Sequence, residues 1–546
     1  MLRASRRANA LALAACGATA LALKLLLVWH YHVDSDEPQH MHVVWAWTHG
    51  LLPYRDVFDN HTPLFHLLMV PVLRLLGARP DIVIWGRVIM VPLWMLAIGL
   101  TFVIARTIDG AARAAWCAVL VAALPIFTTR TTEFRTDDLW TVVWLAAVAL
   151  LLARRPSTAR TFVVCVLLGL AVTVSMKTTL LLVTVLVASA FAPFVAGRRA
   201  QRPSLARGCA GAIGLTVPPT IVAAYFWGHD ALGPLWYGVV EHNLLPERAG
   251  VVAARLVVLT LAIVGVAVAA RSTASGDTTH GLARAWLMLV TGTYLALVVI
   301  GWPARTPQTF LPIMPLVIVL AVSTAGRLLD ARRPSRPVPV GAFVMVFVLE
   351  AAVTGVHARA WQNDAARQVQ LVAEVLKLTS PDDYVFDFKG EAIFRRRPYY
   401  LVFESFTRRR LALGLLRDDV ADRLIETRTC VTVPVTMPGL ERTAVFVNAH
   451  YLAVGGWLVA GAILTPNQGR AEFEVPFSAP YIVVGRTGPV AGWVDGRSNA
   501  RSQLLTAGRH VFVAASSETA QMALMWGPAA ERGFSPFGAA ESLARH

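Results

Sequence analysis

Acidic and histidine residues are concentrated in one stretch near the start of the sequence, residues 30–81. The acidic residues of this stretch include Asp34, Asp36, Glu37, Asp56 and Asp59. Seven of the fourteen histidines lie there too: His30, His32, His40, His42, His49, His61 and His66. A carboxylate held in a fixed place can take a proton from an attacking hydroxyl group, so the stretch contains candidates for a general base. Taken alone, the cluster would also suit a solvated loop.

A second charged cluster lies in the segment TTEFRTDDLW, which contains Glu133, Arg135, Asp137 and Asp138. Apolar runs flank this segment, and charged residues beside such runs are costly and therefore informative. Single cations occupy two further breaks between apolar runs: Lys177 in SMKTT and Arg305 in WPARTPQTFLPIMP. Carboxylates and cations that meet at one membrane surface suit a general base that faces an anionic, membrane-borne leaving group.

The composition indicates that a membrane positions these residues. Of 546 residues, 56% are hydrophobic and 15% are charged, and the mean hydropathy is +0.55. Soluble domains have about a quarter of their residues charged, so this chain needs a solvent other than water. Its formal net charge of +16 could attract nucleic acid. However, Lys and Arg fall in short clusters between apolar runs, as in cytoplasmic loops. We therefore expect membrane lipids, and no nucleic acid, as partners.

Apolar runs that are long enough, or nearly so, to span hydrocarbon predict a polytopic α-helical membrane protein with about 11 transmembrane helices. The runs are residues 11–29, 82–105, 111–127, 136–152, 161–176, 178–195, 208–227, 251–270, 283–302, 310–322 and 338–356. A further run, 62–76, would reverse the side of every later basic cluster if it crossed the bilayer. We therefore interpret it as an interfacial or re-entrant helix.

The positive charges set the predicted orientation. Basic residues occupy the N-terminus and every second loop: Arg3, Arg6, Arg7, Arg106, Arg113, Arg154, Arg155, Arg160, Arg198, Arg199, Arg202, Arg207, Arg271, Arg284, Arg327, Arg332, Arg333 and Arg336. Because cytoplasmic loops carry the excess of Lys and Arg, we expect a cytoplasmic N-terminus in the plasma (inner) membrane. An odd number of spans then places everything after Val356 outside the cytoplasm. The first run lacks a clear small-residue cleavage site and is interpreted as a retained anchor.

The pattern of residues changes after Val356. We predict a transmembrane domain, residues 1–356, followed by an extracytoplasmic soluble domain, residues 357–546. An amphipathic helix is expected over 360–378, and short strands are expected over 383–388, 430–435, 479–485 and 508–516. The soluble domain would divide into an α/β part, residues 357–440, and a β-rich, sandwich-like part, residues 441–546.

Two observations bear on metals and cofactors. The five cysteines form no CxxC pair, so neither a thiolate zinc site nor a disulfide framework is expected. A divalent metal is an alternative at His32, Asp34, Asp36 and His40, because Asp36 and His40 would share one face of a helix. The competing interpretation is that these are polar residues at the level of the lipid headgroups, and we predict no cofactor.

Three motifs resemble those of the GT-C membrane glycosyltransferases. They are DSDE after the first apolar run, then GLLPYRDVFDNHTPLFHLL, and EFRTDDL before the fourth run. The branch in question contains the aminoarabinose–lipid A transferases, the rhizobial lipopolysaccharide glycosyltransferases and, more distantly, the protein O-mannosyltransferases. The resemblance covers roughly residues 10–320. Its first-loop motif is fairly specific, and RTPQTFLPIMP supports it weakly.

The resemblance implies an activity and residues that carry it out. It implies a hexosyl- or pentosyltransferase that moves a sugar from a polyprenyl-phosphate donor to a glycan, lipid or protein acceptor of the cell envelope, with inversion. Asp36 matches the family's catalytic base, and Asp137 would position the acceptor or the sugar. The candidate substrate-binding residues are Asp34, Glu37, Arg55, Asp59, His61, Arg135, Lys177 and Arg305.

This chain departs from the family pattern at two places. Related aminoarabinose transferases usually have an arginine shortly after the acidic pair, where this chain has Gln39 and His40. They also have Lys-Pro at the end of the loop, where this chain has His61, Thr62 and Pro63. Contacts to the donor phosphate must then come partly from the other candidate cations: Arg55, His61, Arg135, Lys177 and Arg305.

Two functions of other classes compete with glycosyl transfer. A transporter or flippase of a lipid-linked sugar would place charged residues within its spans, often in paired half-repeats. Here the charges lie in outer loops, and no internal repeat is apparent. The other alternative is a catalytically inactive scaffold whose soluble domain binds glycan, which activity measurements would separate from an enzyme.

Overall fold

The chain folds into two compact units, which are each described by themselves. A computed structural model describes residues 2–152, 157–197, 204–245, 249–274, 280–302, 305–332, 340–516 and 521–538. The first unit, called the membrane unit, comprises Met1–Val33, Asn60–Met69 and Ile84–Ala365. The second, called the C-terminal unit, comprises Asp34–Asp59, Val70–Val83 and Ala366–His546. Residues 34–59, which contain the DSDE motif, therefore fold together with the C-terminal part of the chain.

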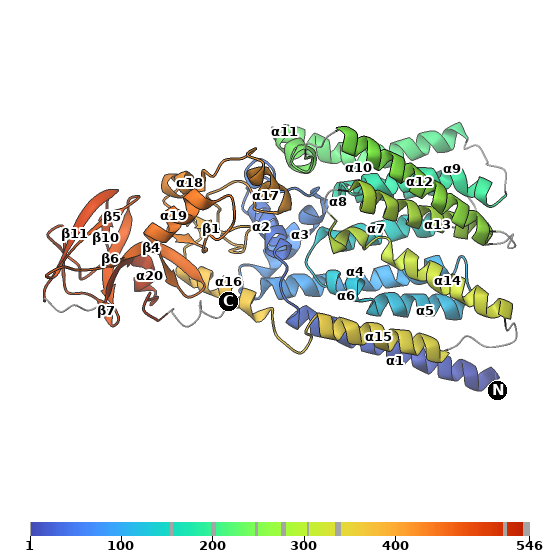
Figure 1. Ribbon diagram of the computed structural model, residues 1–546, viewed down its shortest axis with the longest axis horizontal. Coiled ribbons are helices and arrows are strands. Elements are labelled where there is room, and N and C mark those ends of the chain that lie inside the picture. Colours follow the sequence, from blue (N-terminus) through green and yellow to red (C-terminus); the bar gives the residue numbers. More distant parts are fainter. Residues whose placement is uncertain are drawn as a thin grey trace. The chain divides into compact units, whose positions relative to one another are not determined.

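The membrane unit is a bundle of helices that form from the predicted apolar runs (Figure 1). The main helices are α1 (Leu2–His30), α4 (Ile82–Ala105), α5 (Ala111–Ala123), α7 (Thr136–Leu151), α8 (Thr158–Val174), α9 (Thr178–Val195), α10 (Leu205–Trp227), α12 (Ala249–Ala274), α13 (Gly281–Ala296), α14 (Met314–Arg332) and α15 (Val340–His357). Each predicted run overlaps one of them. Within the described residues, seven helices are long and apolar enough to cross a membrane. The chain is therefore a multi-pass α-helical membrane protein, as predicted.

Short helices follow or separate some of these main helices. They are α6 (Pro125–Arg130), α11 (Leu232–Trp236), η1 (Tyr237–Glu241), η2 (Leu297–Gly301) and η3 (Pro307–Phe310). The uncertain run, 62–76, forms α3 (Leu64–Leu76), a helix of 13 residues. At 1.5 Å per residue it is about 20 Å long, and the hydrocarbon core is about 30 Å thick. Helix α5 is equally short, so the assignment of α3 as an interfacial or re-entrant helix stays a prediction.

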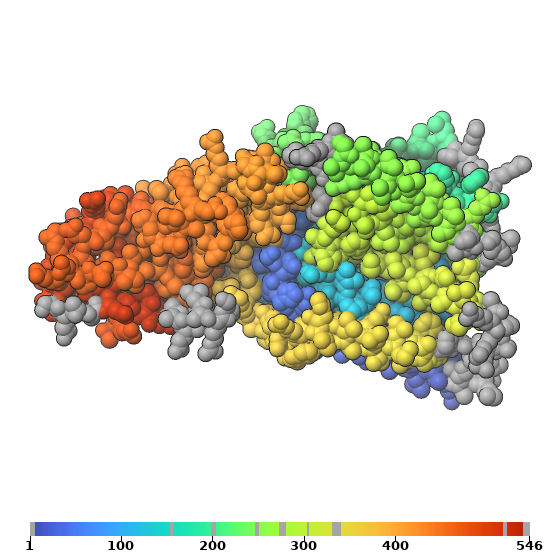
Figure 2. All heavy atoms as spheres, in the orientation of Figure 1, coloured from blue at the N-terminus to red at the C-terminus, as the bar shows by residue number. Residues whose placement is uncertain are grey.

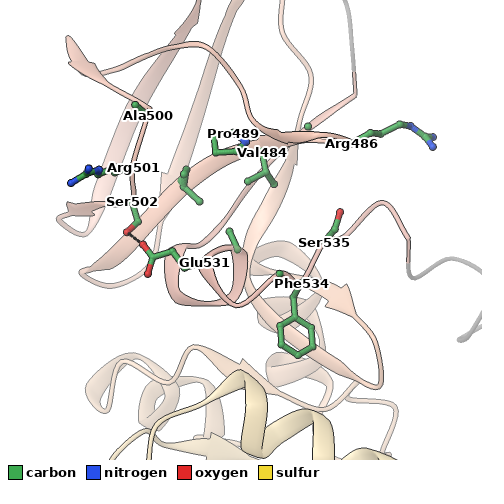
Figure 3. A pocket seen from close by; sticks show the side chains of 14 residues that line it. Val484, Arg486, Pro489, Ala500, Arg501, Ser502, Glu531, Phe534 and Ser535 are labelled. Atoms are coloured by element: carbon green, nitrogen blue, oxygen red, sulfur yellow. Dashed lines mark hydrogen bonds between the residues drawn. The ribbon is translucent and has the colours of Figure 1, made fainter.

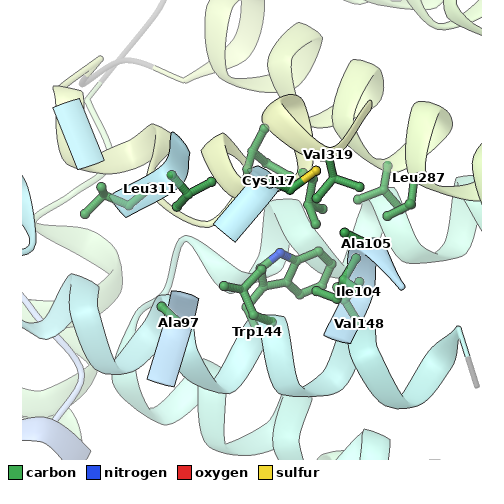
Figure 4. Packing of buried hydrophobic residues seen from close by; sticks show 14 of the residues in the cluster. Ala97, Ile104, Ala105, Cys117, Trp144, Val148, Leu287, Leu311 and Val319 are labelled. Carbon is green, nitrogen blue, oxygen red and sulfur yellow. The ribbon is translucent and has the colours of Figure 1, made fainter. Parts of the chain in front are cut away.

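Tryptophans form much of the core of the membrane unit. Trp116, Trp140 and Trp144 are completely buried. In Figure 4, Trp144 packs beside Val148 and Ile104, below Cys117 and Val319. In contrast, α12 exposes apolar side chains such as Leu256 (58%), Leu261 (67%) and Val268 (66%). Apolar residues in such numbers on an outer face indicate contact with lipid.

Helix α5 packs centrally against several partners, since it contacts α1, α14 and α15. Figure 2 shows this arrangement as cyan atoms, from the part of the chain that holds α4 and α5, between the yellow surfaces of α14 and α15. Trp116 on α5 stacks on Phe343 of α15 with ring centroids 5.3 Å apart. The last helix of the unit is therefore held by a specific aromatic contact as well as by its apolar surface.

The C-terminal unit contains helix α2 (Asp36–Thr48) and two β-sheets. The larger sheet has the order β1-β2-β4-β12-β6-β10, with β3 beside β4 and β7 beside β6; the smaller has the order β5-β11-β8-β9. The strands are β1 (Val385–Phe386), β2 (Val431–Thr432), β3 (Tyr451–Val454), β4 (Trp457–Leu464), β5 (Arg470–Val475), β6 (Ala479–Gly485), β7 (Gly488–Pro489), β8 (Gly492–Val494), β9 (Arg497–Ser498), β10 (Gln503–Leu505), β11 (Gly508–Ala514) and β12 (Met522–Trp526). The further helices are α16 (Ala366–Leu378), α17 (Ser405–Ala412), α18 (Val420–Glu426), α19 (Glu441–His450) and α20 (Gly527–Glu531).

The strands predicted in this region are found with different lengths. The 479–485 strand matches β6, and β11 covers most of 508–516. The 383–388 and 430–435 strands are reduced to two residues each, β1 and β2, which pair in parallel. Because β2 also pairs with β4, the α/β and β-rich parts share one sheet.

Some residues used to predict the orientation lie outside the described residues. They are Arg154, Arg155, Arg198, Arg199, Arg202, Arg333 and Arg336. The backbones of Arg3 and Arg332 lie in α1 and α14, but their side chains are likewise outside the description. The orientation therefore stays a prediction.

Helices α8 and α10 approach each other closely at two glycines. A Cβ on Gly214 of α10 would lie 2.6 Å from Phe162 O and 3.1 Å from Cys165 Cβ of α8. A Cβ on Gly169 of α8 would lie 2.6 Å from Leu215 O of α10. Distances this short to backbone atoms cannot be relieved by a side-chain rotation, so the two backbones depend on the absence of a side chain.

We predict that Gly214→Ala destabilises the membrane unit by about 1–3 kcal/mol, because the helices must move apart to admit the new methyl group. Thermal unfolding of the detergent-purified protein measures this as a lower Tm. Gly208→Ala on the same helix is the control, since a Cβ there meets nothing within 4 Å. Equal Tm values for the two variants would show that the close approach is not needed for stability.

Candidate active site

The acidic motif DSDE leads into α2, whose first two residues are Asp36 and Glu37, and its three carboxylates have different partners. The backbone N–H of Asp36 donates to Asp34 Oδ1 at 3.0 Å, and the backbone N–H of Asp34 donates to Glu37 Oε1 at 3.0 Å. Reciprocal bonds of this kind fix the start of a helix. Asp34 and Glu37, which were predicted to bind substrate, therefore bond to the backbone in this structure.

Asp36 has a different partner, a cation from the far end of the sequence. Lys389 Nζ forms an ion pair with Asp36 Oδ1 and lies 3.0 Å from Ser35 Oγ. The two residues are 353 positions apart, and the exposed fractions of their side chains are 13% for Lys389 and 23% for Asp36. The carboxylate predicted as the base is thus partly accessible and is bound by the ammonium group of Lys389.

The loop that carries Lys389 is built around a buried carboxylate. Asp387, which follows β1, accepts hydrogen bonds from the backbone N–H groups of Gly390 (2.7 Å) and Ala392 (2.8 Å). Arg397 Nε donates to the same carboxylate at 2.9 Å. A carboxylate with three donors needs no solvent, so it can organise a loop from the inside.

This loop packs directly against α2. Gly390 has a φ of +94°, and a Cβ at this position would lie 2.8 Å from His42 Cβ. His42 Nδ1 lies 2.9 Å from Ile393 O. Glu391 Oε2 accepts the backbone N–H of Lys389 at 2.8 Å, and burial, with the charge of Asp387, raises the pKa of Glu391 to about 7. Glycine at position 390 therefore allows the approach that brings Lys389 to Asp36.

Two further candidates from the first stretch also lie in the C-terminal unit. Arg55 binds Asp56 through Nε (3.0 Å) and a terminal nitrogen (2.9 Å), and its side chain is 46% exposed. The turn that carries them includes Tyr54, whose φ of +69° is unusual for a residue other than glycine. Asp59 is completely buried. Arg55 is accessible to an anion but already forms a bidentate ion pair.

The other candidate catalytic residue, Asp137, lies in the membrane unit at the start of α7 between two cations. Arg135 Nε lies 3.3 Å from Asp137 Oδ2, and Lys177 Nζ lies 3.1 Å from Asp137 Oδ1. Glu133 extends the cluster, since it binds Arg130 at 2.6 Å and lies 3.6 Å from Arg135. The structure thus brings Arg135, Asp137 and Lys177 together, as the sequence predicted. It also shows that both cations form ion pairs with Asp137.

His61 and Arg305 differ in their relation to this cluster. His61 lies close enough to Asp137 for the two side chains to interact electrostatically. Arg305 is exposed, and its guanidinium lies 3.4 Å from Val299 O of η2. The structure therefore groups His61 with the cluster and places Arg305 on a separate exposed segment.

Sequence analysis missed two buried cations that position these segments. Lys24 of α1 is completely buried and donates to Thr128 O (3.1 Å), Thr131 Oγ1 (2.9 Å) and Thr132 Oγ1 (3.0 Å). It thereby fixes the turn that leads to Glu133 and Arg135. A lone lysine within an apolar run was the signal for it.

The second missed cation is Arg87 of α4. It is completely buried and donates to Tyr31 O at 2.7 Å and to His32 O at 2.8 Å. These carbonyls lie at and just after the end of α1, so Arg87 caps that helix.

The metal alternative receives no structural support within the part of the chain that the structure describes. No group of three or more His, Cys, Asp or Glu residues there could hold a metal ion. The four residues considered, His32, Asp34, Asp36 and His40, do not form such a group. Asp34 and Asp36 are instead engaged by the backbone and by Lys389.

Similarity to solved structures identifies the fold. No protein-family model and no curated protein matches the sequence. The structure is similar to ArnT from Cupriavidus metallidurans, an aminoarabinose transferase, bound to undecaprenyl phosphate (13% identity) and in the apo state (14%). Each comparison has a TM-score of 0.54 and covers 82% of this chain and 97% of ArnT.

A second kind of enzyme has a related structure. The Archaeoglobus fulgidus oligosaccharyltransferase, tethered with an acceptor peptide, has a TM-score of 0.50 and 12% identity, over 82% of this chain and 72% of the other. Identities this low show a common fold and nothing finer. That fold is the one the sequence motifs predicted.

We predict that Asp137→Asn destabilises the membrane unit by about 3–5 kcal/mol, because it leaves the buried Arg135 and the partly buried Lys177 beside a neutral amide. Thermal or denaturant unfolding measures the loss. The double variant Asp137→Asn/Lys177→Met should recover part of it, because it removes one of the unpaired cations. Equal stability of the wild type and the single variant would show that Asp137 is not needed to neutralise this cluster.

Proposed function

Because the chain has the fold of the GT-C membrane glycosyltransferases, we propose that it transfers a sugar from a polyprenyl-phosphate donor to an acceptor of the cell envelope. The transfer would occur at the extracytoplasmic face of the plasma (inner) membrane. The donor class is supported by the ArnT structure, which binds undecaprenyl phosphate. The acceptor is a glycan, a lipid or a protein.

The placement of Asp36 is the observation that carries this proposal. Of the three carboxylates of DSDE, Asp34 and Glu37 accept backbone N–H groups, whereas Asp36 projects from the first turn of α2 to Lys389. A base must be accessible and held in one orientation, and the ion pair supplies the orientation. The resemblance to the GT-C family assigns the base to the same residue.

The proposed reaction is a direct displacement. The acceptor hydroxyl loses its proton to the Asp36 carboxylate while its oxygen forms a bond to the anomeric carbon of the sugar. The bond between that carbon and the phosphate oxygen breaks, and its electron pair remains on the polyprenyl phosphate. Attack on the face opposite the phosphate inverts the anomeric configuration.

The leaving phosphate needs cations as its charge grows. We propose Arg135 and Lys177 for this role, with His61 beside them. Both cations are bound to Asp137. Asp137 would therefore hold them in place, and a phosphate would share them with it. Arg55 and Arg305 are exposed and are further candidates for phosphate contacts, and Asp59 remains a candidate for binding substrate.

We predict that Asp36→Asn lowers sugar transfer by about two to four orders of magnitude, the scale of losing a general base. Transfer is measured from the glycolipid products of membranes that contain the variant, by mass spectrometry. The control is Asp34→Asn, which keeps an acceptor oxygen for the backbone N–H of Asp36 and should have a much smaller effect. Thermal unfolding of both variants verifies that they are folded.

Two outcomes of this experiment would contradict the proposal. Normal transfer by Asp36→Asn together with an inactive Asp34→Asn would move the base to Asp34. Normal transfer by both variants would make the first-loop carboxylates structural and would favour the transporter or flippase.

We further predict that a reporter fused after residue 356 behaves as an extracytoplasmic protein. An alkaline phosphatase fusion should be active there, and a fluorescent protein that folds only in the cytoplasm should be dark. The reason is the excess of basic residues in alternate loops. Fusions after Arg207 are the opposite control, since this basic loop is predicted to be cytoplasmic. The reverse pattern of signals would overturn the orientation and the proposed face of the reaction.

A further inference from the structure

A small cleft lies in the C-terminal unit between α2, the 51–57 turn and residues 384–400. Its volume is about 140 Å³. Pockets that enclose a whole small-molecule ligand usually have volumes of about 300–1,000 Å³. The cleft therefore fits one ring of a larger molecule.

His42 of α2 supplies the cleft with a hydrogen-bond acceptor. The residue is 3% exposed, and its Nδ1 lies 2.9 Å from Ile393 O. A carbonyl oxygen only accepts, so Nδ1 carries the hydrogen and Nε2 carries a lone pair. Burial lowers the pKa of His42 to about 4, so the ring is neutral. His42 lines the cleft, and its Nε2 has no hydrogen-bond partner within the described residues.

Aromatic rings form part of the wall of the cleft. Tyr399 and Tyr400 line it, and their hydroxyl groups are bound elsewhere, Tyr400 to Tyr54 O and Tyr399 to Asp419. The rings therefore contribute apolar surface. A sugar ring has apolar C–H groups and polar hydroxyl groups, which match such rings and the free acceptor of His42.

The cleft has an excess of one positive charge. Arg397 is paired with Asp387 at 2.9 Å, and Asp56 is paired with Arg55 at 2.9 Å, so these four charges cancel. Arg396 also lines the cleft, is exposed, and forms no ion pair with another described residue. His42 is neutral and adds no charge to the cleft. The positive charge of Arg396 is therefore available to a ligand. A guanidinium binds a carboxylate or a phosphate.

We propose that this cleft binds one sugar ring that carries an anionic group, with His42 Nε2 accepting a sugar hydroxyl and Arg396 binding the anion. The inference rests on the proposed function, because it names the chemistry of one of its substrates. An acidic sugar of the acceptor and the sugar phosphate of the donor share this chemistry. The φ of +69° at Tyr54 adds a strained turn of the kind found at binding sites.

A larger cavity in the β-sheets, of about 510 Å³, lacks these features. Its central polar groups, Ser502 and Glu531, bond to each other at 2.5 Å. The side chains of Arg486 and Arg501 extend away from it (Figure 3). Its central polar groups therefore satisfy each other, whereas the other cleft is lined by His42 and Arg396.

The test measures sugar binding without turnover, by saturation-transfer difference NMR on the full-length protein in lipid nanodiscs. The probes are methyl β-D-glucuronide, glucose 1-phosphate and neutral methyl β-D-glucoside. His42→Asn keeps a donor for Ile393 O and removes the acceptor at Nε2. Arg396→Gln removes the charge from an exposed residue, so it should not affect folding. His49→Asn is the matched control, because His49 follows the end of α2 and does not line the cleft.

We expect the two anionic probes to bind the wild type with millimolar Kd values, more tightly than the neutral glucoside. His42→Asn should weaken all three by about tenfold, the scale of one lost hydrogen bond to a buried group. Arg396→Gln should weaken only the anionic probes, and His49→Asn should behave as the wild type. Undecaprenyl phosphate that displaces glucose 1-phosphate would identify the donor as the source of the sugar, and its failure to compete would identify the acceptor.

The proposal is overturned if no probe binds the wild type at concentrations up to about 10 mM, or if His42→Asn binds all probes normally. Asp36→Asn separates this proposal from the proposed function. It should bind the sugars as the wild type does, whether or not it transfers them. An Asp36→Asn variant that binds the sugars normally but does not transfer them supports both proposals. Normal transfer by a protein whose cleft binds no sugar refutes only the proposal that the cleft binds sugar.

Discussion

Several contacts in both units follow from one constraint, which is that a charged group removed from water is costly unless a partner matches it. In the membrane unit, Lys24 is matched by two threonine hydroxyls and a carbonyl, and Asp137 is matched by Arg135 and Lys177. In the C-terminal unit, Asp387 is matched by Arg397 and two backbone N–H groups. The bonds of Lys24 and of Lys177 join segments that are 104–108 and 40 positions apart, whereas those of Asp387 organise its own loop. The charges therefore help to determine how the segments lie.

The elements that sequence analysis predicted well are those whose cause is local. Apolar runs produce helices regardless of what surrounds them, so all eleven runs overlap main helices. DSDE was recognised because it is an acidic cluster directly after the first apolar run and resembles a GT-C motif. The 383–388 strand was predicted too long, because its chain turns at Asp387 to surround that carboxylate. Asp387 and Gly390, three positions apart, are residue types that favour a turn, and the strand prediction did not take them into account.

The candidate site could be predicted only in part, for the same reason. Asp36, Asp137, Arg135 and Lys177 stand in motifs beside apolar runs, which made them visible. Lys389 stands 353 residues from Asp36 in an ordinary loop, and only the folded chain shows their contact. Likewise, His42 was one histidine among seven until the structure showed its ring to be buried with one nitrogen bound to Ile393 O.

The interleaving of the C-terminal unit has a consequence for the synthesis of the protein. Residues 34–59 leave the ribosome long before the chain from Ala366 onward with which they fold. Lys389 follows Asp36 by 353 residues, which takes roughly 20–70 s at about 5–20 residues per second. During that interval α2 has neither its ion pair nor its packing partner. A chain that is released before Lys389 is made therefore has its membrane helices, but its DSDE motif lacks the contact with Lys389. Translation must continue past Lys389 before the candidate site can assemble.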